Sequence, residues 1–443
     1  MFKFFRSLAR FLGIIFLSRG ASELSTKGTL AVENHENNYY NNNNSDTYLA
    51  KRRVDELKFV AVILRHGDRS PGRIIPTKNY SITYWPQGLK KLTPLGIEQT
   101  YGVGQYLRHR YSRWFTDELL PDGQVEVSSS AQDRAIDSAT ALLHGLFPET
   151  LNDSQWNRTL TKHRIPIKTA PVTQDPLLKP SKYSCPALDT WKTMTRSLLW
   201  NALESLPQNQ EFLSLLRQRS GIPNLTLQTV EELYRPLLVQ RIHNVGMPEW
   251  VTEPIWLRMS QLYRMAYTIE ANDIVETKFR AGLLTGEILR RIIQIANNSV
   301  IDKSLKFHMK IYSTHAGTLL PILSNFGLFD GEFPAYASAL MIELWEDKNV
   351  PTNEANRYYV TFKFRNETNH NQYDLVPNFC RTTNAEMGDG LFVSRRSQRC
   401  RLLKLQEALK PRIYKSVADL DASCKQSSID LVSLLPNNGM SVG

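Results

Sequence analysis

The chain has few cysteines and lacks the features of several protein classes. Only four of its 443 residues are cysteine, too few for a small fold built on disulfides, although an even number suits two bridges in a secreted protein. After the N-terminal segment, no stretch approaches the roughly 18 apolar residues needed to cross a membrane, so we expect no membrane span. Apolar residues make up 42% and charged residues 22% of the chain, which excludes collagen-like and wholly disordered proteins.

The sequence also lacks a metal-binding pattern. His109, His144 and His163 lie on unrelated segments and no Cys/His cluster has ligand spacing, so we predict neither a metal nor another cofactor. Charge is unbalanced: 54 Lys and Arg oppose 43 Asp and Glu, with a formal net charge of +11. That excess leaves nucleic acid, anionic surfaces and anionic substrates open as partners.

The N-terminus has the pattern of a secretory signal peptide. Basic residues in the first ten positions precede the apolar residues 11–17, and small residues follow that permit cleavage after Gly20 or Ala21. A mitochondrial presequence or a short anchor is the alternative, because Arg-rich starts overlap with signal peptides. Seven Asn-x-Ser/Thr sequons favour secretion. They begin at Asn43, Asn79, Asn152, Asn157, Asn224, Asn297 and Asn366.

Four segments are expected along the chain. Residues 1–20 form the signal peptide, and residues 21–55 a flexible leader whose Asn-rich tract cannot bury enough surface to offset its ordering entropy. A folded domain covers 56–425, with an α-helical insertion over roughly 175–280, and 426–443 form a C-terminal tail. We expect a product secreted to the extracellular space, with the lysosomal lumen as the alternative destination.

Two expected strands end near histidines. The apolar run at 57–64 has the length and β-branched character of a strand buried on both faces. A second strand at 307–312 alternates apolar and polar residues. The first run is followed by His66 and the second by His315. A single histidine in such a place is more often structural, but two beyond strand ends favour a site, because ligands of open α/β sheets bind there.

Two helices are predicted on either side of the insertion. Thr93 and Pro94 begin one, since a hydroxyl N-cap followed by proline is a start signal. The other covers 281–296, where apolar residues recur every three or four positions. The alternation of strands and helices favours an open α/β sheet. The buried side of the first helix is expected to contain Leu95, Ile97, Tyr101, Tyr106 and Leu107.

The residues around His66 suit phosphate chemistry. Arg65 and Arg69 place two permanent cations beside one imidazole, and guanidinium groups match phosphate oxygens bidentately. A neutral imidazole there can attack phosphorus, while the arginines stabilise the transition-state charge. The cations also depress the histidine pKa. We expect Gly67 to allow close approach of a ligand. The alternative is a basic turn neutralised by local carboxylates such as Asp68.

The sequence RHGDRSP at 65–71 resembles the histidine acid phosphatases, most closely the animal prostatic, lysosomal and venom-type members. The likeness covers about residues 57–425 and continues in further short segments. These are 85–89, 92–93, 95–96, 133–134, 242–244 with Pro248 and Trp250, 336–338, 343–344 and 364–368.

That resemblance implies a mixed central sheet flanked by helices, with a smaller α-helical insertion. It also implies hydrolysis of phosphomonoesters through a phosphohistidine. His66 would be the nucleophile, Arg65 and Arg69 would bind phosphate, and His315 would hydrogen-bond the phosphoryl group. The resemblance further implies disulfides between Cys185 and Cys424 and between Cys380 and Cys400, and a homodimer as one state of assembly.

Two positions depart from the family pattern. His315 is followed by Ala316, where the animal members have an aspartate that protonates the leaving group, and then by Gly317, where the inositol-phosphatase branch has a glutamate. A third phosphate-binding arginine is expected six residues before Arg134. That position is Ser128, or Ser129 if the alignment slips by one residue. The candidates to replace the missing general acid are water, Asp330 and Glu332.

We therefore interpret the chain as a secreted acid phosphatase acting on a small phosphomonoester, with weakened or selective activity. The alternative is a catalytically inactive secreted phosphatase-like protein that binds a phosphate ligand or acts as an effector. We do not expect nucleic acid as a partner, because the basic residues near 395–401 lack interleaved aromatic side chains and a nucleic-acid fold signature.

Overall fold

A computed structural model describes most of the region expected to fold. The described residues are 55–77, 80–115, 124–147, 165–297, 308–352, 354–366, 371–381 and 399–426. All of them belong to one compact unit, Arg53–Gly443. The expected signal peptide, nearly all of the leader and of the C-terminal tail, four sequons (Asn43, Asn79, Asn152 and Asn157), His163, Arg395 and Arg396 lie outside the described residues.

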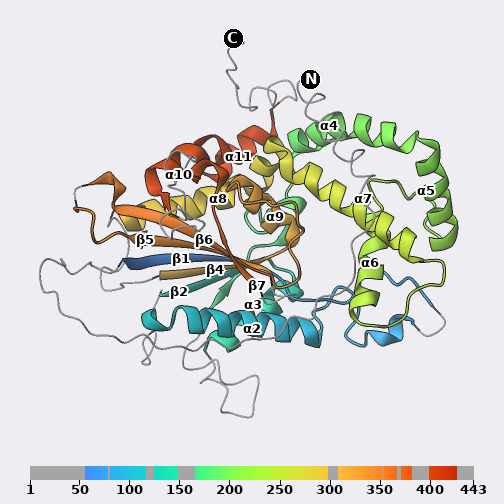
Figure 1. The fold of residues 1–443 in the computed structure, drawn as a ribbon, viewed down its shortest axis with the longest axis horizontal. Coiled ribbons are helices and arrows are strands. Elements are labelled where there is room, and N and C mark those ends of the chain that lie inside the picture. Colours follow the sequence, from blue (N-terminus) through green and yellow to red (C-terminus); the bar gives the residue numbers. More distant parts are fainter. Residues whose placement is uncertain are drawn as a thin grey trace, which may run out of the picture. The chain divides into compact units, whose positions relative to one another are not determined.

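A mixed β-sheet forms the centre of the fold (Figure 1). Its strand order is β3-β2-β4-β1-β5-β6-β7, and β8 pairs with β6. Strands from β3 to β1 are parallel, whereas those from β1 to β7 are antiparallel. The strands are β1 (Glu56–Arg65), β2 (Val125–Ser129), β3 (Ile167–Lys168), β4 (His308–Thr314), β5 (Ala339–Glu346), β6 (Tyr358–Asn366), β7 (Asn371–Leu375) and β8 (Cys400–Arg401). The predicted fold class, a mixed sheet flanked by helices, is confirmed.

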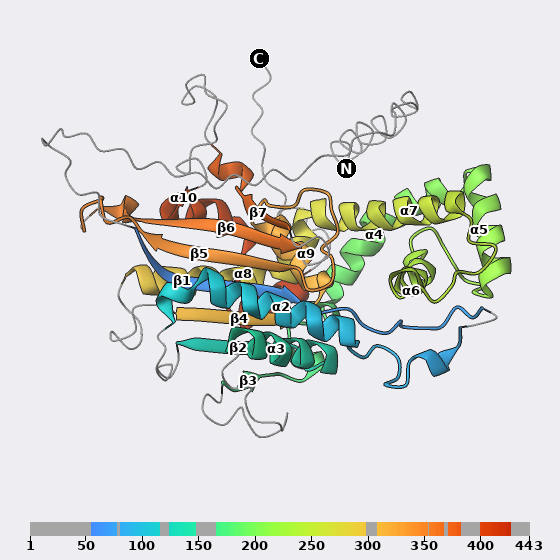
Figure 2. The same cartoon turned by 60° about the horizontal axis from the view of Figure 1, so that its bottom comes forward.

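Helices cover both faces of this sheet (Figures 1 and 2). One face packs against α2 (Pro94–Arg110) and α3 (Asp133–Leu146), and the other against α8 (Ile274–Ala296), α9 (Ala316–Asn325) and α10 (Leu402–Leu409). Alternate residues of β1 enter the two apolar clusters, which explains its unbroken apolar sequence. Ile63 packs on the α8 side and Val62 on the α2 side.

Further helices form a group with its own apolar core, built around Leu233, Trp256 and Met259. They are α4 (Pro186–Glu204), α5 (Pro207–Ser220), α6 (Glu231–Ile242) and α7 (Glu253–Asn272). In Figure 1, α5 and α6 lie beyond the end of the sheet toward which β1 runs. This group therefore stands next to the strand ends that carry the predicted site residues. None of the helices in the described part of the chain has the length and apolar character required to cross a bilayer.

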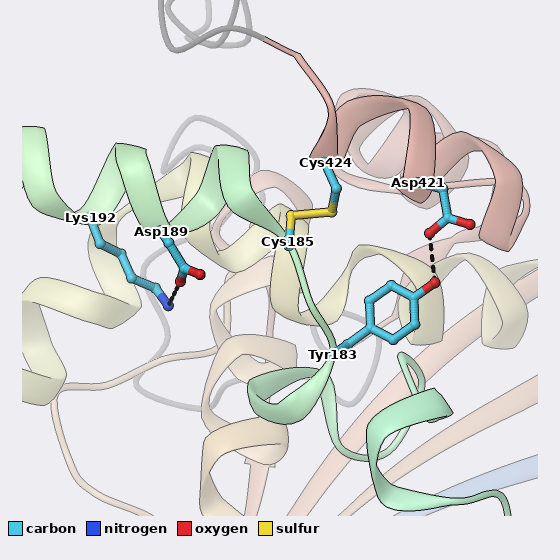
Figure 3. Close-up of a disulfide and its surroundings, with 6 residues drawn as sticks. All are labelled: Tyr183, Cys185, Asp189, Lys192, Asp421 and Cys424. Carbon is cyan, nitrogen blue, oxygen red and sulfur yellow. Dashed lines mark hydrogen bonds and ion pairs between the residues drawn. A yellow bond between two sulfur atoms is a disulfide. The ribbon is translucent and has the colours of Figure 1, made fainter.

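Two disulfides join segments distant in sequence. Cys185 and Cys424, 239 residues apart, connect the start of α4 to the end of α11 (Val417–Cys424; Figure 3). Near this bridge, the Tyr183 hydroxyl donates a hydrogen bond of 2.6 Å to Asp421. A second disulfide connects Cys380 to Cys400. The pairing is the one that the resemblance implies.

The expected buried side of α2 was largely wrong. Thr93 caps the helix as predicted, accepting from the backbone N–H of Gly96 at 3.1 Å. Of the five residues expected inside, however, only Leu107 is fully buried, and Ile97 is 39% exposed. The buried side is instead Gly96, Thr100, Val103, Gly104 and Leu107.

Close packing against α3 explains this difference. A Cβ atom added to Gly104 would lie 2.0 Å from the backbone oxygen of Leu142, and one added to Gly145 would lie 2.1 Å from that of Tyr101. The two helix backbones approach each other at these glycines. Small residues therefore face the partner helix, and larger side chains are displaced to the flanks.

We expect Gly104→Ala to destabilise the protein by about 1–3 kcal/mol, because the added methyl group overpacks the α2–α3 contact. This sign is unusual, since the same change in an exposed helix stabilises by about 1 kcal/mol. Urea unfolding of Gly104→Ala, with the exposed neighbour Gln105→Ala as control, measures the effect. An unchanged or higher unfolding midpoint in Gly104→Ala would show that the helices can separate at little cost.

Candidate active site

Hydrogen bonds from two other segments fix the backbone of His66. Its N–H donates to the carbonyl of Thr314 at the end of β4 (3.0 Å), and its carbonyl accepts from the N–H of Ala337 (3.1 Å). Ala337 has a φ of 55°, a left-handed conformation that is uncommon for a residue with a side chain. His66 is thus held just beyond β1, where β1 and β4 end side by side.

The imidazole of His66 is held in one tautomer. Its Nδ1 lies 2.8 Å from the carbonyl oxygen of Gly67, which can only accept, so Nδ1 carries the proton. Its Nε2 is then unprotonated and accepts a hydrogen bond from Nε of Arg134 at 3.2 Å. Burial, followed by His315 and Arg134, lowers the His66 pKa well below its usual value. The lowered pKa favours the neutral form of the His66 imidazole in mildly acidic medium.

His315 lies beside His66, as the sequence predicted. The two ring centroids are 5.2 Å apart in an edge-to-face arrangement. Nε2 of His315 is 2.7 Å from the Ser130 hydroxyl, while its buried Nδ1 has no partner among the described residues. When Ser130 donates to Nε2, the proton of the neutral ring is on Nδ1, where it can donate to a phosphoryl oxygen. Burial and then Lys179 hold the His315 pKa well below its usual value.

Arginine side chains surround the two rings. Arg65 is buried, its guanidinium carbon lies 4.1 Å from the ring centroid of Tyr336, and it donates to the carbonyl of Pro334. Its buried Nε has no hydrogen-bond partner within the described residues. Arg69 is anchored by a bond of 2.7 Å from its guanidinium to the Ser70 carbonyl. Burial and Arg69 lower the pKa of Arg134 to about 10.

Asp68 does not neutralise these arginines in the part of the chain that the structure describes. Its carboxylate accepts from the Thr93 hydroxyl and from Nε2 of His243, each at 2.6 Å. His243 ends α6 and packs edge-to-face on Trp85 at 4.8 Å. Asp68 therefore joins the loop after β1 to α2 and to the helical group, so the basic turn balanced by Asp68 is excluded.

Gly67 has a packing role besides the predicted one of admitting a ligand, which stays a prediction. A Cβ atom there would meet the backbone oxygen of Gly96 at 2.2 Å. The close approach that requires a glycine is thus to the first turn of α2. It brings the loop after β1 against that helix.

The two departures from the family pattern lie on α9 and on β2. Ala316 and Gly317 begin α9, and neither has an ionisable group. Ser128 lines a cavity of about 430 Å³ together with Leu178 and Glu287. Of the proposed substitute acids, Glu332 is exposed and paired with Arg264, and Asp330 accepts from the backbone N–H of Glu332.

Three residues near the two histidines were not predicted as site residues from the sequence. Arg134 was named only as part of the family resemblance. Its place at the start of a helix that follows a strand could have indicated a site residue. Ser130 and Lys179 had no signal, because isolated serines and lysines are common on surfaces. Among the described residues, no group of His, Cys, Asp and Glu has the arrangement of a metal site.

Comparison with known proteins identifies the class of protein to which this fold and site belong. The sequence model of the histidine phosphatase superfamily, branch 2, matches residues 56–365, and the chain belongs to that family. It is 32% identical to prostatic acid phosphatase of Mus musculus over 72% of this chain and 81% of that protein. It is 31% identical to lysosomal acid phosphatase of Bos taurus, covering 72% and 73%.

Solved structures with the same fold include a phytase from Hafnia alvei. With a TM-score of 0.57 and 14% identity, the match covers 86% of this chain and 100% of the phytase. A phytase from Citrobacter braakii matches with a TM-score of 0.54 and 17% identity, covering 82% and 99%. These neighbours support the fold. The prediction that the chain is a phosphoric monoester hydrolase of the acid-phosphatase family is confirmed by the family and the curated relatives.

Removing the charge of Arg134 should change the pH dependence of the reaction. Arg134 lowers the His66 pKa, so Arg134→Met should raise that pKa and shift the acidic limb of kcat/KM to higher pH. Loss of a charged hydrogen bond to phosphate should also lower kcat/KM by about 10- to 100-fold. The exposed Arg73→Met is the matched control and should keep the original profile. An unmoved acidic limb in Arg134→Met would refute this electrostatic role.

Proposed function

We propose that the chain is a secreted acid phosphatase that hydrolyses small phosphomonoesters through a phosphohistidine on His66. The observation that carries this proposal is the neutral Nε2 of His66, free of its own proton and facing Arg134. A phosphorus atom approaching this nitrogen would lie among the guanidinium groups of Arg65, Arg69 and Arg134. That arrangement matches the charge that develops during phosphoryl transfer.

The reaction would proceed in two displacements. Nε2 of His66 attacks phosphorus, the bond to the ester oxygen breaks, and the leaving alkoxide takes up a proton. Water then attacks the phosphohistidine, the P–N bond breaks, and inorganic phosphate leaves. His315 would donate from Nδ1 to a phosphoryl oxygen. The Nδ1–H of His66 stays bonded to Gly67 throughout, which stabilises the phosphorylated ring.

Activity is proposed to be weakened or selective, because Ala316, Gly317 and Ser128 lack the groups expected at their positions. A positioned general acid contributes about 10²- to 10⁴-fold to a rate. Its loss matters most for alkyl esters, whose leaving groups are strongly basic. The same residues favour the second candidate function, an inactive secreted protein that binds a phosphate ligand through its arginines.

The proposal of secretion is supported by the signal-like N-terminus, the sequons and two disulfides, which form in oxidising compartments. The relatives are named prostatic and lysosomal acid phosphatases, so the lysosomal lumen remains the alternative destination. A homodimer is proposed on the resemblance alone.

Two esters separate the candidate functions. At mildly acidic pH we expect the purified protein to hydrolyse nitrophenyl phosphate faster than an alkyl phosphate, and His66→Ala to reduce both rates to background. The exposed His109→Ala is the matched control. If the wild-type protein hydrolyses neither ester yet binds inorganic phosphate in calorimetry, the binding function is correct and the enzymatic proposal is lost.

A further inference from the structure

The segment before Lys179 is fastened to the start of α9. The carbonyl oxygen of Leu178 accepts hydrogen bonds from the hydroxyls of Thr314 (2.7 Å) and Thr318 (3.0 Å). These two threonines bracket residues 315–317, which include His315 and the two positions without an acid. Lys179 follows Leu178 directly, so its backbone lies next to the place where the family's acid is missing.

The backbone around Lys179 is rigid. The N–H of Leu178 donates to the Asp175 carboxylate at 2.8 Å, and the N–H of Lys179 donates to the Asp175 carbonyl at 3.2 Å. The carbonyl of Lys179 then accepts from the N–H of Lys182 at 2.9 Å. Bonds on both sides of the residue hold its Cα in place.

Several cations act on the ammonium group of Lys179. Among the described residues, no carboxylate is within ion-pair distance of its Nζ. The nearby Asp175 carboxylate interacts with the Lys179 charge, and its Oδ1 accepts from the Leu178 N–H. Burial, followed by the charges of Arg134, Lys182, Arg235 and Arg69, lowers the pKa of Lys179 to about 7. In turn, Lys179 lowers the His315 pKa more than Arg134, Arg65 or Arg69 does. Its amino group therefore belongs to the electrostatic environment of the site.

We propose that Lys179 is the general acid that protonates the leaving oxygen of alkyl phosphates. The proposal rests on the proposed function, since it names the proton donor for the first displacement at His66. The geometry points to Lys179 because Leu178 is bonded on both sides of Ala316 and Gly317, where other members carry a carboxylic acid.

The proton balance closes without another reactant. As Nε2 of His66 bonds to phosphorus, the bond from phosphorus to the ester oxygen breaks, and Lys179 transfers a proton from Nζ to that oxygen. Water then attacks the phosphohistidine and gives up its proton to solvent, phosphate leaves, and the free His66 is restored. The neutral amine takes a proton from solvent and returns to the ammonium form. A donor whose pKa lies near neutrality is well matched to protonating the leaving oxygen.

Lys179→Met and Lys179→Arg test the proposal on the same two esters. In Lys179→Met, we expect kcat for the alkyl phosphate to fall by about 10²- to 10⁴-fold, but kcat for nitrophenyl phosphate to change little, because its leaving group needs no proton. Lys179→Arg keeps the charge but does not release a proton, so it should restore KM and leave alkyl kcat low. The exposed Lys404→Met, on α10, is the matched control, and thermal melting monitors folding.

The pH profile gives a second measurement. Wild-type kcat/KM for the alkyl ester should decline as pH rises through about 7, because Lys179 must be protonated to act. Titration of the substrate is common to all variants, so the difference between wild type and Lys179→Met isolates the lysine. We expect that difference to disappear above neutrality.

Three results would overturn the role of Lys179. They are equal losses on both esters in Lys179→Met, wild-type alkyl turnover in Lys179→Met, or full recovery of alkyl kcat in Lys179→Arg. Each of these results requires a wild-type protein that is active and depends on His66. The proposed phosphatase function would therefore stand even if the role of Lys179 failed. If the wild-type protein hydrolyses neither ester, the proposed function itself fails and this role fails with it.

Discussion

The structure depends on keeping two histidines neutral at the point where two parallel strands end among fixed positive charges. The ring centroids of His66 and His315 lie 5.2 Å apart, and both rings are buried. The pKa of each ring is lowered, because protonation would place a positive charge away from water and next to other cations. An anion relieves this repulsion. This electrostatic environment supports the proposed binding of phosphate, and the lowered pKa favours the neutral imidazole that the proposed nucleophile requires.

Holding like charges together requires support from the whole fold. The loop after β1 is fixed by Asp68, which bonds both Thr93 at the start of α2 and His243 at the end of α6. The partners come from segments 25 and 175 residues away along the chain. The helical group thus contributes to the position of the loop, and Arg235 of α6 adds its charge to that of Arg134.

Sequence and structure agree where the signal is local. The apolar run before His66 predicted a strand covered on both faces, and the Thr93–Pro94 pair predicted the start of α2. Packing between distant elements was not predictable: the side of α2 that faces α3 is set by Gly104 and Gly145, which carry no hydrophobic signal. Lys179 could not be predicted from the sequence either, because hydrogen bonds from distant residues to the preceding Leu178 determine its position.

The central claim is that His66 forms a covalent phosphoenzyme. Rapid quenching of the protein with phosphorus-labelled nitrophenyl phosphate, followed by peptide mass spectrometry under alkaline conditions that preserve phosphohistidine, measures this directly. We predict label on the peptide that contains His66, absent from the peptide of His315. Turnover without a labelled intermediate, or label on another residue, would contradict the account.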